Sequence, residues 1–113
     1  MTSRQKKLDE FARAWVDADR NYSADVAAAE GNAPLLQKIE ANWWRHQANW
    51  SMAATAALEA NNEKIQAIFD EAKAANDAIK EAREKAEGIA KIVRSSSAAA
   101  SALSKLLEAL AKA

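Results

Sequence analysis

The sequence predicts an all-α fold, an antiparallel helical bundle with coiled-coil-like packing. Apolar residues recur at spacings of three and four along most of the 113 residues, as on one face of an α-helix. Two glycines, one proline and alanine at about a quarter of the positions also favour helices over strands and long loops. We expect one domain, residues 1–113, with three long helices and either a C-terminal extension or a short fourth helix. The expected ranges are 3–30, 34–60, 62–94 and 97–112, with the last two continuous in one alternative.

The first helix, over residues 3–30, has the clearest boundaries. Thr2 and Gln5 have the spacing of a capping box, in which each side chain accepts a hydrogen bond from the other residue's backbone N–H. Gly31 suits the left-handed position after a helix end, and Asn32 with Pro34 suits the start of the next helix. The apolar stripe of this first helix consists of Leu8, Phe11, Trp15, Ala18, Tyr22, Val26 and Ala29.

The second helix, over residues 34–60, carries its stripe at Leu36, Ile39, Trp43, His46, Trp50, Ala53 and Ala57. Trp43 and Trp50 are seven residues apart and point the same way, so we expect both to be buried. Trp44 is turned by about 100° from Trp43 and is expected to be more exposed. The stripe slips by about one residue at residues 60–62, where Asn61 and Asn62 suit a helix end and a helix start. We expect a tight corner there; a register shift within one unbroken helix is the alternative.

The third stripe starts at Ile65 and keeps its phase through Val93 to Leu110. Gly88 and the serines at 95–97 each suit a helix break, because glycine adopts left-handed conformations and serine competes for backbone hydrogen bonds. A loop has little reason to preserve the phase, so phase continuity favours one unbroken helix. That helix would span about 75 Å, against about 40 Å for each of the first two helices. The C-terminal part of the stripe would then lie uncovered.

Composition and charge exclude several classes of function. The chain has 16 Lys and Arg against 16 Asp and Glu, so no net field attracts nucleic acid or an anionic membrane. The absence of cysteine excludes a disulfide scaffold, a zinc ribbon and a thiol nucleophile. With one histidine and two glycines, the sequence lacks the HExxH zinc motif and the glycine-rich phosphate loops. We therefore expect no catalytic residue, no metal-ligand set and a protein that is not an enzyme.

The uncovered stripe predicts a structural or interaction protein. It would associate with itself, most simply as a dimer, or with a helix of another protein. The candidate interface residues are Ile89, Val93, Leu103, Leu107 and Leu110. A charge at Leu107 would replace a buried residue of that interface, so Leu107→Glu is expected to dissociate the oligomer.

A second interpretation is a carrier of an aromatic small molecule, held around Trp15, Trp43, His46 and Trp50. In its most specific form, His46 ligates the metal of a planar cofactor such as haem, with indole rings against the macrocycle. A simpler explanation is favoured. Bulky tryptophans fill a core that is diluted by alanine, and His46 either fixes the register of the bundle or lies near the surface with one ring nitrogen in water.

A third interpretation places the amphipathic segment 89–113 on a lipid surface. It is not favoured, because this segment has no tryptophan or phenylalanine anchor. The N-terminus lacks the apolar core of a signal peptide, and the uncharged stretch over residues 47–58 is shorter than the ~20 residues of a membrane span. We expect a soluble cytoplasmic protein. No motif in the sequence identifies a family.

Overall fold

The computed structural model describes residues 2–113, and these residues form helices and connecting turns with no strand. The five helices are α1 (Ser3–Arg20), α2 (Tyr22–Ala28), α3 (Ala33–Ala53), α4 (Glu63–Glu84) and α5 (Ile89–Ala111). They hold 81% of the chain in a body that measures 44 × 24 × 20 Å. The all-helical prediction is confirmed.

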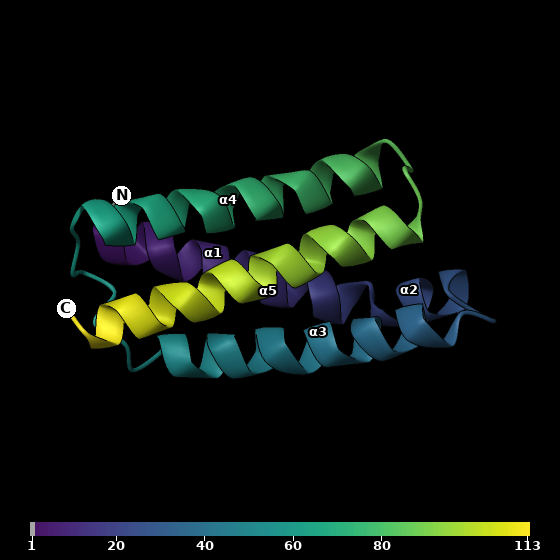
Figure 1. The fold of residues 1–113 in the computed structure, drawn as a ribbon, viewed down its shortest axis with the longest axis horizontal. Helices are drawn as coiled ribbons and strands as arrows, with labels where there is room; N and C mark the ends of the chain where they lie inside the picture. The colour runs from purple at the N-terminus through teal and green to yellow at the C-terminus, as the bar shows by residue number, and fades with distance from the viewer. Residues whose placement is uncertain (1) are drawn as a thin grey trace.

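Four long helices lie side by side and alternate in direction, and the short α2 follows α1 at one end (Figure 1). Both termini lie at the opposite end, together with the connection over residues 54–62. The connections over residues 29–32 and 85–88 lie at the end that holds α2. We call residues 2–60 the N-terminal hairpin and residues 63–113 the C-terminal hairpin. The most extensive interface between two helices is that of α4 with α5, inside the C-terminal hairpin.

Side-chain caps lie at the starts of α1 and α3, at the residues that the sequence predicted. The N–H of Gln5 donates to Thr2 Oγ1 at 3.2 Å, and the N–H of Thr2 donates to Gln5 Oε1 at 3.1 Å, which completes the predicted capping box. Asn32 Oδ1 accepts from the N–H of Leu35 at 3.2 Å and so caps α3. These local signals satisfy backbone donors that a helix start leaves without partners.

The predicted first helix is divided at Asn21, which corrects the expected range of residues 3–30. Asn21 Nδ2 donates to the backbone oxygen of Asp17 at 2.8 Å, and the Asn21 backbone N–H donates to the same oxygen at 3.1 Å. A side chain that competes for a helix carbonyl in this way weakens the regular ladder. The second piece, α2, ends at Ala28, and Gly31 then takes the predicted left-handed conformation with φ of 85°.

The second helix ends seven residues earlier than predicted, at Ala53. Residues 54–62 form a turn-rich connection in which Leu58 is fully buried. Position 58 would lie off the buried face of a longer α3, so leaving the helix lets Leu58 contribute its apolar area to the core. The predicted corner at residues 60–62 is confirmed where the next helix begins. There, Asn62 Oδ1 accepts from the N–H of Ile65 at 2.8 Å and caps α4.

The prediction of one unbroken helix after residue 62 is wrong, because the chain reverses over residues 85–88. The N–H of Glu87 donates to Ala82 O at 2.9 Å and that of Ala86 to Arg83 O at 3.2 Å, which is a Schellman ending. Ala86 holds the left-handed position with φ of 51°, and Gly88 starts α5 with φ of 98°. The connection is about one helical turn long, so the apolar stripe keeps its phase across a real break.

The fourth helix, α5, is therefore long rather than short, and the serines at 95–97 lie within it. Because α5 folds back against α4, Val93, Leu103, Leu107 and Leu110 are buried and Ile89 is half-buried. The premise of an uncovered C-terminal stripe is wrong, since it required the unbroken helix. Self-association itself stays a prediction, but this stripe lies inside the chain's own core.

Apolar side chains from all four long helices meet at the end that holds the termini, which we call the apolar end. Its buried members are Phe11, Ala14, Ala53, Leu58, Ile65, Phe69, Ala72, Ala102, Leu103, Leu106, Leu107 and Leu110. A smaller cluster at the opposite end has Ala29, Ile39 and Val93 as its buried members. None of the helices in residues 2–113 combines the length and apolarity that crossing a membrane requires.

Candidate functional site

The buried face of α3 is more polar than the sequence predicted. It consists of Ile39, Asn42, His46, Asn49 and Ala53. Trp43 and Trp50 are half-buried, so the expectation that both are buried is wrong, whereas Trp44 is 58% exposed as expected. The reason lies in α5, which presents serines to this face and so provides hydrogen-bond partners for asparagine. The larger indoles of Trp43 and Trp50 lie at the edges of this buried face.

The core also contains buried polar side chains, seven of which we call the polar layer: Glu10, Asp25, Asn42, His46, Asn49, Asn76 and Ser96. Lys7 is buried as well, over the ring of Phe69 at the apolar end. Their tertiary hydrogen bonds run from the N-terminal hairpin to the C-terminal hairpin. Buried polar groups are costly unless they are paired, so these bonds select one alignment of the two hairpins.

Across the α3–α5 interface the pairing repeats every seven residues. Asn42 Nδ2 donates to Ser97 Oγ at 3.0 Å, and Ser104 Oγ donates to Asn49 Oδ1 at 3.2 Å. Asn49 Nδ2 also donates to the backbone oxygen of Ala100 at 3.3 Å. Matching seven-residue intervals on both helices place the two asparagines opposite serines in the same alignment of α3 and α5.

His46 occupies the middle of this interface. Its Nε2 lies 3.2 Å from Ser96 O and 3.1 Å from Ser96 Oγ, and Nδ1 is buried without a partner. With the proton on Nε2 the ring donates to Ser96 O, and with the proton on Nδ1 it accepts from Ser96 Oγ. Burial lowers the pKa of His46 from 6.5 to about 4, the bond to Ser96 opposes this, and the charge of Arg45 adds to the lowering. The imidazole is therefore neutral at pH 7.

A haem-like cofactor does not fit the surroundings of His46. His46 lines none of the main cavities in residues 2–113, and the cavity beside its partner Ser96 has a volume of only about 10 Å³, which is room for one water molecule. A porphyrin would require α3 and α5 to separate. In residues 2–113 no group of three or more His, Cys, Asp or Glu side chains has the arrangement to hold a metal ion.

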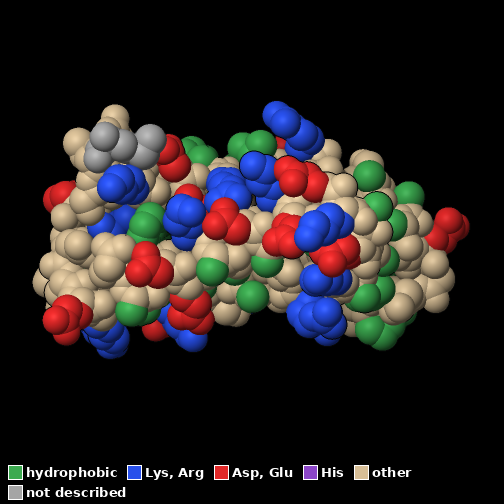
Figure 2. Space-filling model, turned by 90° about the horizontal axis from the view of Figure 1, so that it is seen from above, with side chains coloured by type: hydrophobic (Ala, Val, Ile, Leu, Met, Phe, Trp, Pro, Cys, Tyr) green, Lys and Arg blue, Asp and Glu red, His purple; other side chains and the backbone are tan. Residues whose placement is uncertain are grey.

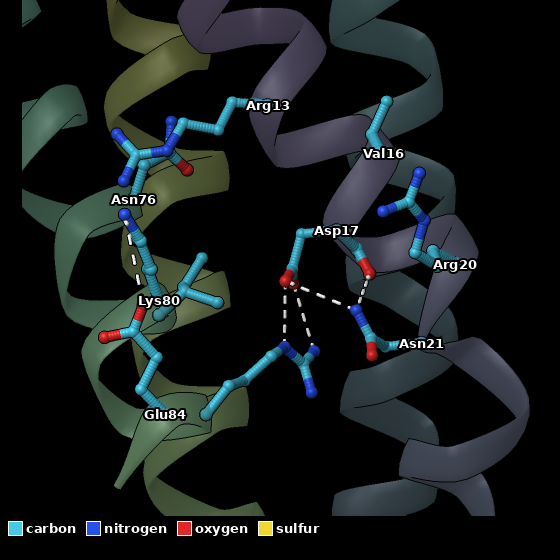
Figure 3. A pocket seen from close by; sticks show the side chains of 10 residues that line it. Arg13, Val16, Asp17, Arg20, Asn21, Asn76, Lys80 and Glu84 are labelled. Atoms are coloured by element: carbon cyan, nitrogen blue, oxygen red, sulfur yellow. Dashed lines mark hydrogen bonds and ion pairs between the residues drawn. The ribbon is translucent and has the colours of Figure 1, made fainter.

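The α1–α4 side of the polar layer is held by ion pairs around a groove of about 330 Å³ (Figure 3). Arg83 Nε donates to Asp17 Oδ1 at 2.8 Å, and Arg83 Nη1 donates to Asp25 Oδ1 at 2.9 Å. Desolvation lowers the pKa of Arg83, but the hydrogen bonds to Asp25 and Asp17 outweigh it and raise that pKa above its usual value. The guanidinium is thus fully engaged in joining the hairpins.

Asn76 and Arg13 extend this side of the layer. Asn76 Nδ2 donates to Glu10 O at 3.1 Å and to Glu10 Oε1 at 3.0 Å, while Arg13 Nη2 lies 2.7 Å from Asp77 Oδ1. On the face seen in Figure 2, acidic and basic side chains are intermingled rather than gathered by sign. Arg13, Lys80 and Arg83 in the lining of this groove are each paired with a carboxylate, whereas Arg20 forms no ion pair within residues 2–113. These pairs join α1 and α2 to α4, so we attribute the groove mainly to hairpin docking.

Aromatic residues gather at the surface where α1 and α2 pack on α3. The ring of Trp43 lies at the centre of this cluster, with centroid distances of 5.3 Å to Trp15, 6.0 Å to Tyr22 and 4.9 Å to Trp44. The Tyr22 and Trp44 rings are inclined to Trp43 by 60° and 87°. Such edge-to-face contacts are favourable arrangements of aromatic rings and hold the indoles in fixed orientations.

This cluster borders an open surface depression of about 420 Å³, which we call the aromatic hollow. Its lining residues are Asp19, Tyr22, Ser23, Glu40, Trp43 and Trp44. Trp43 Nε1 donates to Asp19 Oδ1 at 3.0 Å, which fixes the indole against α1. Within the described part of the chain, neither Asp19 nor Glu40 forms an ion pair. The hollow thus combines aromatic walls with two carboxylates that form no ion pair.

The four residues predicted to hold a ligand do not form one site. Trp15 and Trp43 contact each other, His46 points into the polar layer, and Trp50 packs on the apolar end. The other residues of the hollow were not selected from the sequence. The available signal was helical spacing: Glu40 shares a face with Trp43 and Trp44, and Asp19 shares one with Tyr22.

Comparisons with protein-family models, with curated proteins and with solved structures found no match for this chain.

Proposed function

We propose that the protein is a non-enzymatic interaction module that binds a partner protein through the aromatic hollow. The exposed indole of Trp44, beside the half-buried Trp43 and Tyr22, is the observation that carries the proposal. Trp44 is more exposed than any other large apolar side chain in residues 2–113. Tryptophan and tyrosine are enriched in protein interfaces, where a few such residues supply most of the binding energy.

The openness of the hollow favours a protein over a small molecule. Sites for small molecules bury about 70–90% of the ligand surface. Trp44 is 58% exposed in a wall of this hollow, so an aromatic ligand lying here would keep one side in water. A partner protein supplies its own surface to cover that side.

The other functional interpretations have less support. A dimer that uses Leu103, Leu107 and Leu110 would have to expose residues that the single chain buries. A lipid-bound α5 would have to do the same, because its apolar face packs on α4. A homo-oligomer through another surface stays a prediction, which light scattering after size exclusion tests.

Display of a random peptide library tests the proposal, because it selects binding sequences directly. Peptides would be selected on the protein and then assayed against Trp44→Ala and against the control Met52→Ala, which removes another exposed apolar side chain. The expected result is a set of peptides that bind the unmodified chain and Met52→Ala but not Trp44→Ala. Both variants are expected to unfold within about 0.5 kcal/mol of the unmodified chain. Selected peptides that bind Trp44→Ala as well as the unmodified chain would contradict the proposal.

A further inference from the structure

We infer that the aromatic hollow binds an arginine side chain of the partner protein. The inference rests on the proposed binding of a protein at the hollow and adds the chemistry that the hollow recognises. It follows from the orientation of the rings, the charge of the lining and the groups that are left without partners.

Three aromatic rings that stand at steep angles to one another line the depression. Trp44 stands at 87° to Trp43, and Tyr22 stands at 60° to Trp43. The face of an aromatic ring carries negative electrostatic potential, and tryptophan attracts cations most strongly. A planar cation that lies flat on one indole therefore has its edge directed at the next ring. Guanidinium groups adopt this arrangement readily because they are planar and weakly hydrated.

The lining is acidic and contains no basic residue. Asp19 belongs to α1 and Glu40 to α3, so each of these two helices contributes one carboxylate to the lining. Asp19 Oδ1 already accepts from Trp43 Nε1, which leaves Oδ2 and both oxygens of Glu40 as acceptors for a ligand. Two carboxylates with three oxygens left as acceptors, beside aromatic rings, complement a cation with several N–H donors.

Arg45, which follows Trp44 in the sequence, does not occupy the hollow. Its Nη2 is turned to α5, where it lies 3.5 Å from Ser101 Oγ. The chain therefore leaves the acidic aromatic surface available to a cation from outside.

Arginine fits this lining better than other cations. A lysine ammonium is strongly hydrated and would lose part of its shell to an open hollow without planar stacking in return. A quaternary ammonium would face the rings but has no N–H for Asp19 and Glu40. The guanidinium stacks and donates at the same time, and its five donors suit two carboxylates.

The test uses defined peptides and the indole N–H signals of the four tryptophans. Acetyl-Gly-Arg-Gly-amide would be titrated into ¹⁵N-labelled protein and compared with the citrulline, lysine and N-trimethyl-lysine versions. Saturable shifts of the Trp43 and Trp44 signals, with Trp50 unmoved, are expected for arginine. Citrulline keeps the shape and removes the charge, and we expect about tenfold weaker binding for it.

Matched variants identify the groups that recognise the peptide. Trp44→Ala is expected to remove the shifts of Trp43, and Glu40→Gln to weaken binding about threefold to tenfold. Glu108→Gln is the control for Glu40→Gln, because Glu108 is an exposed acid near the other end of the bundle. It is expected to change nothing.

Several results would overturn the inference. Equal binding of citrulline would show that charge is not recognised, and tighter binding of lysine or N-trimethyl-lysine would show that another cation is preferred. If display yields peptides that depend on Trp44 but lack arginine, the inference fails while the proposed function stands. If no peptide from either experiment depends on Trp44, both fail.

Discussion

At the apolar end of the bundle, Phe11, Leu58 and Leu106 are fully buried among apolar neighbours. Elsewhere in the bundle, asparagine, histidine and charged side chains of the polar layer are buried. The first region excludes water from hydrocarbon, which is the dominant favourable contribution to folding. In the second region, the free-energy cost of removing polar groups from water nearly cancels the stabilisation that their hydrogen bonds provide.

This difference follows the division of the chain into hairpins. Within the C-terminal hairpin, α4 and α5 contact each other through the most extensive helix interface. Between the hairpins, Asn42, Asn76 and Arg83 each bond across the boundary. Apolar packing can tolerate a shift of one helix along another, whereas these pairs cannot. The apolar end thus supplies stability, and the polar layer specifies how the hairpins align.

The largest expected effect is at the apolar end. Leu106→Ala removes a fully buried side chain and leaves a cavity, so it is expected to lower the free energy of unfolding by about 4 kcal/mol. Urea denaturation followed by circular dichroism measures this change.

In the polar layer, Asn49→Ala leaves Ser104 without its acceptor and is expected to lower the free energy of unfolding by about 1–3 kcal/mol in the same measurement. A cost for Asn49→Ala above that for Leu106→Ala would reverse the comparison.

The polar layer is expected to weaken in mild acid because of His46. Its pKa of about 4 in the folded chain lies below 6.5, so as pH falls the unfolded chain takes up the proton first. This contribution is complete above pH 6.5 and is lost between pH 6.5 and 4. At about 1.4 kcal/mol per pKa unit, the loss approaches about 3 kcal/mol.

Urea titrations at pH 7, 6 and 5 measure the loss, with His46→Gln as the control. His46 is the only histidine, and carboxylates titrate mainly below this window. The variant is expected to show a much flatter dependence between pH 7 and 5. An equally steep dependence in His46→Gln would assign the effect to other groups.

A smaller loss is expected from the ion pairs of Arg83. Arg83→Met removes the partner of Asp25, which is buried, and of Asp17, which is half-buried. The expected cost is about 2 kcal/mol, between the values for exposed and fully buried pairs. Adding Asp25→Asn to Arg83→Met removes the buried charge and is expected to recover part of that loss. No recovery in the double variant would mean that the charge of Asp25 is not the source of the cost.

The smallest effect is a gain in the connection between α4 and α5. Ala86 has φ of 51°, a conformation that costs alanine about 1 kcal/mol relative to glycine. Ala86→Gly is therefore expected to raise the melting temperature slightly, as measured by differential scanning calorimetry. A lower melting temperature would argue against the left-handed turn at Ala86 and for a helix that continues through it.

Much of the fold could be predicted from local signals. The capping box at Thr2, the left-handed Gly31 and the cap at Asn62 each depend on a few neighbouring residues, and all three occur in the structure. The break over residues 85–88 escaped prediction for a physical reason. A connection of about one helical turn preserves the phase of the stripe, and the left-handed residue is alanine instead of glycine.

The candidate site was less accessible from the sequence. Trp15 and Trp43, both residues of the predicted ligand site, contact each other, and Trp44 contacts Trp43 as its neighbour in α3. Tyr22 joins them only through the packing of α2 on α3. The burial of Asn42 depends equally on a distant segment. Its partner Ser97 lies 55 residues further along the chain, and the two meet only because α5 folds back.

Native-state hydrogen exchange tests most directly whether the hairpins are held together mainly at the apolar end and aligned by the polar layer. Amides of residues 103–110 in α5 are expected to exchange only through global unfolding, with the free energy that urea denaturation gives. Amides of residues 42–49 in α3 are expected to exchange at a lower free energy, through separation of the hairpins at the polar layer. Equal opening free energies in the two segments would contradict this division of roles and would show that the bundle opens only as a whole.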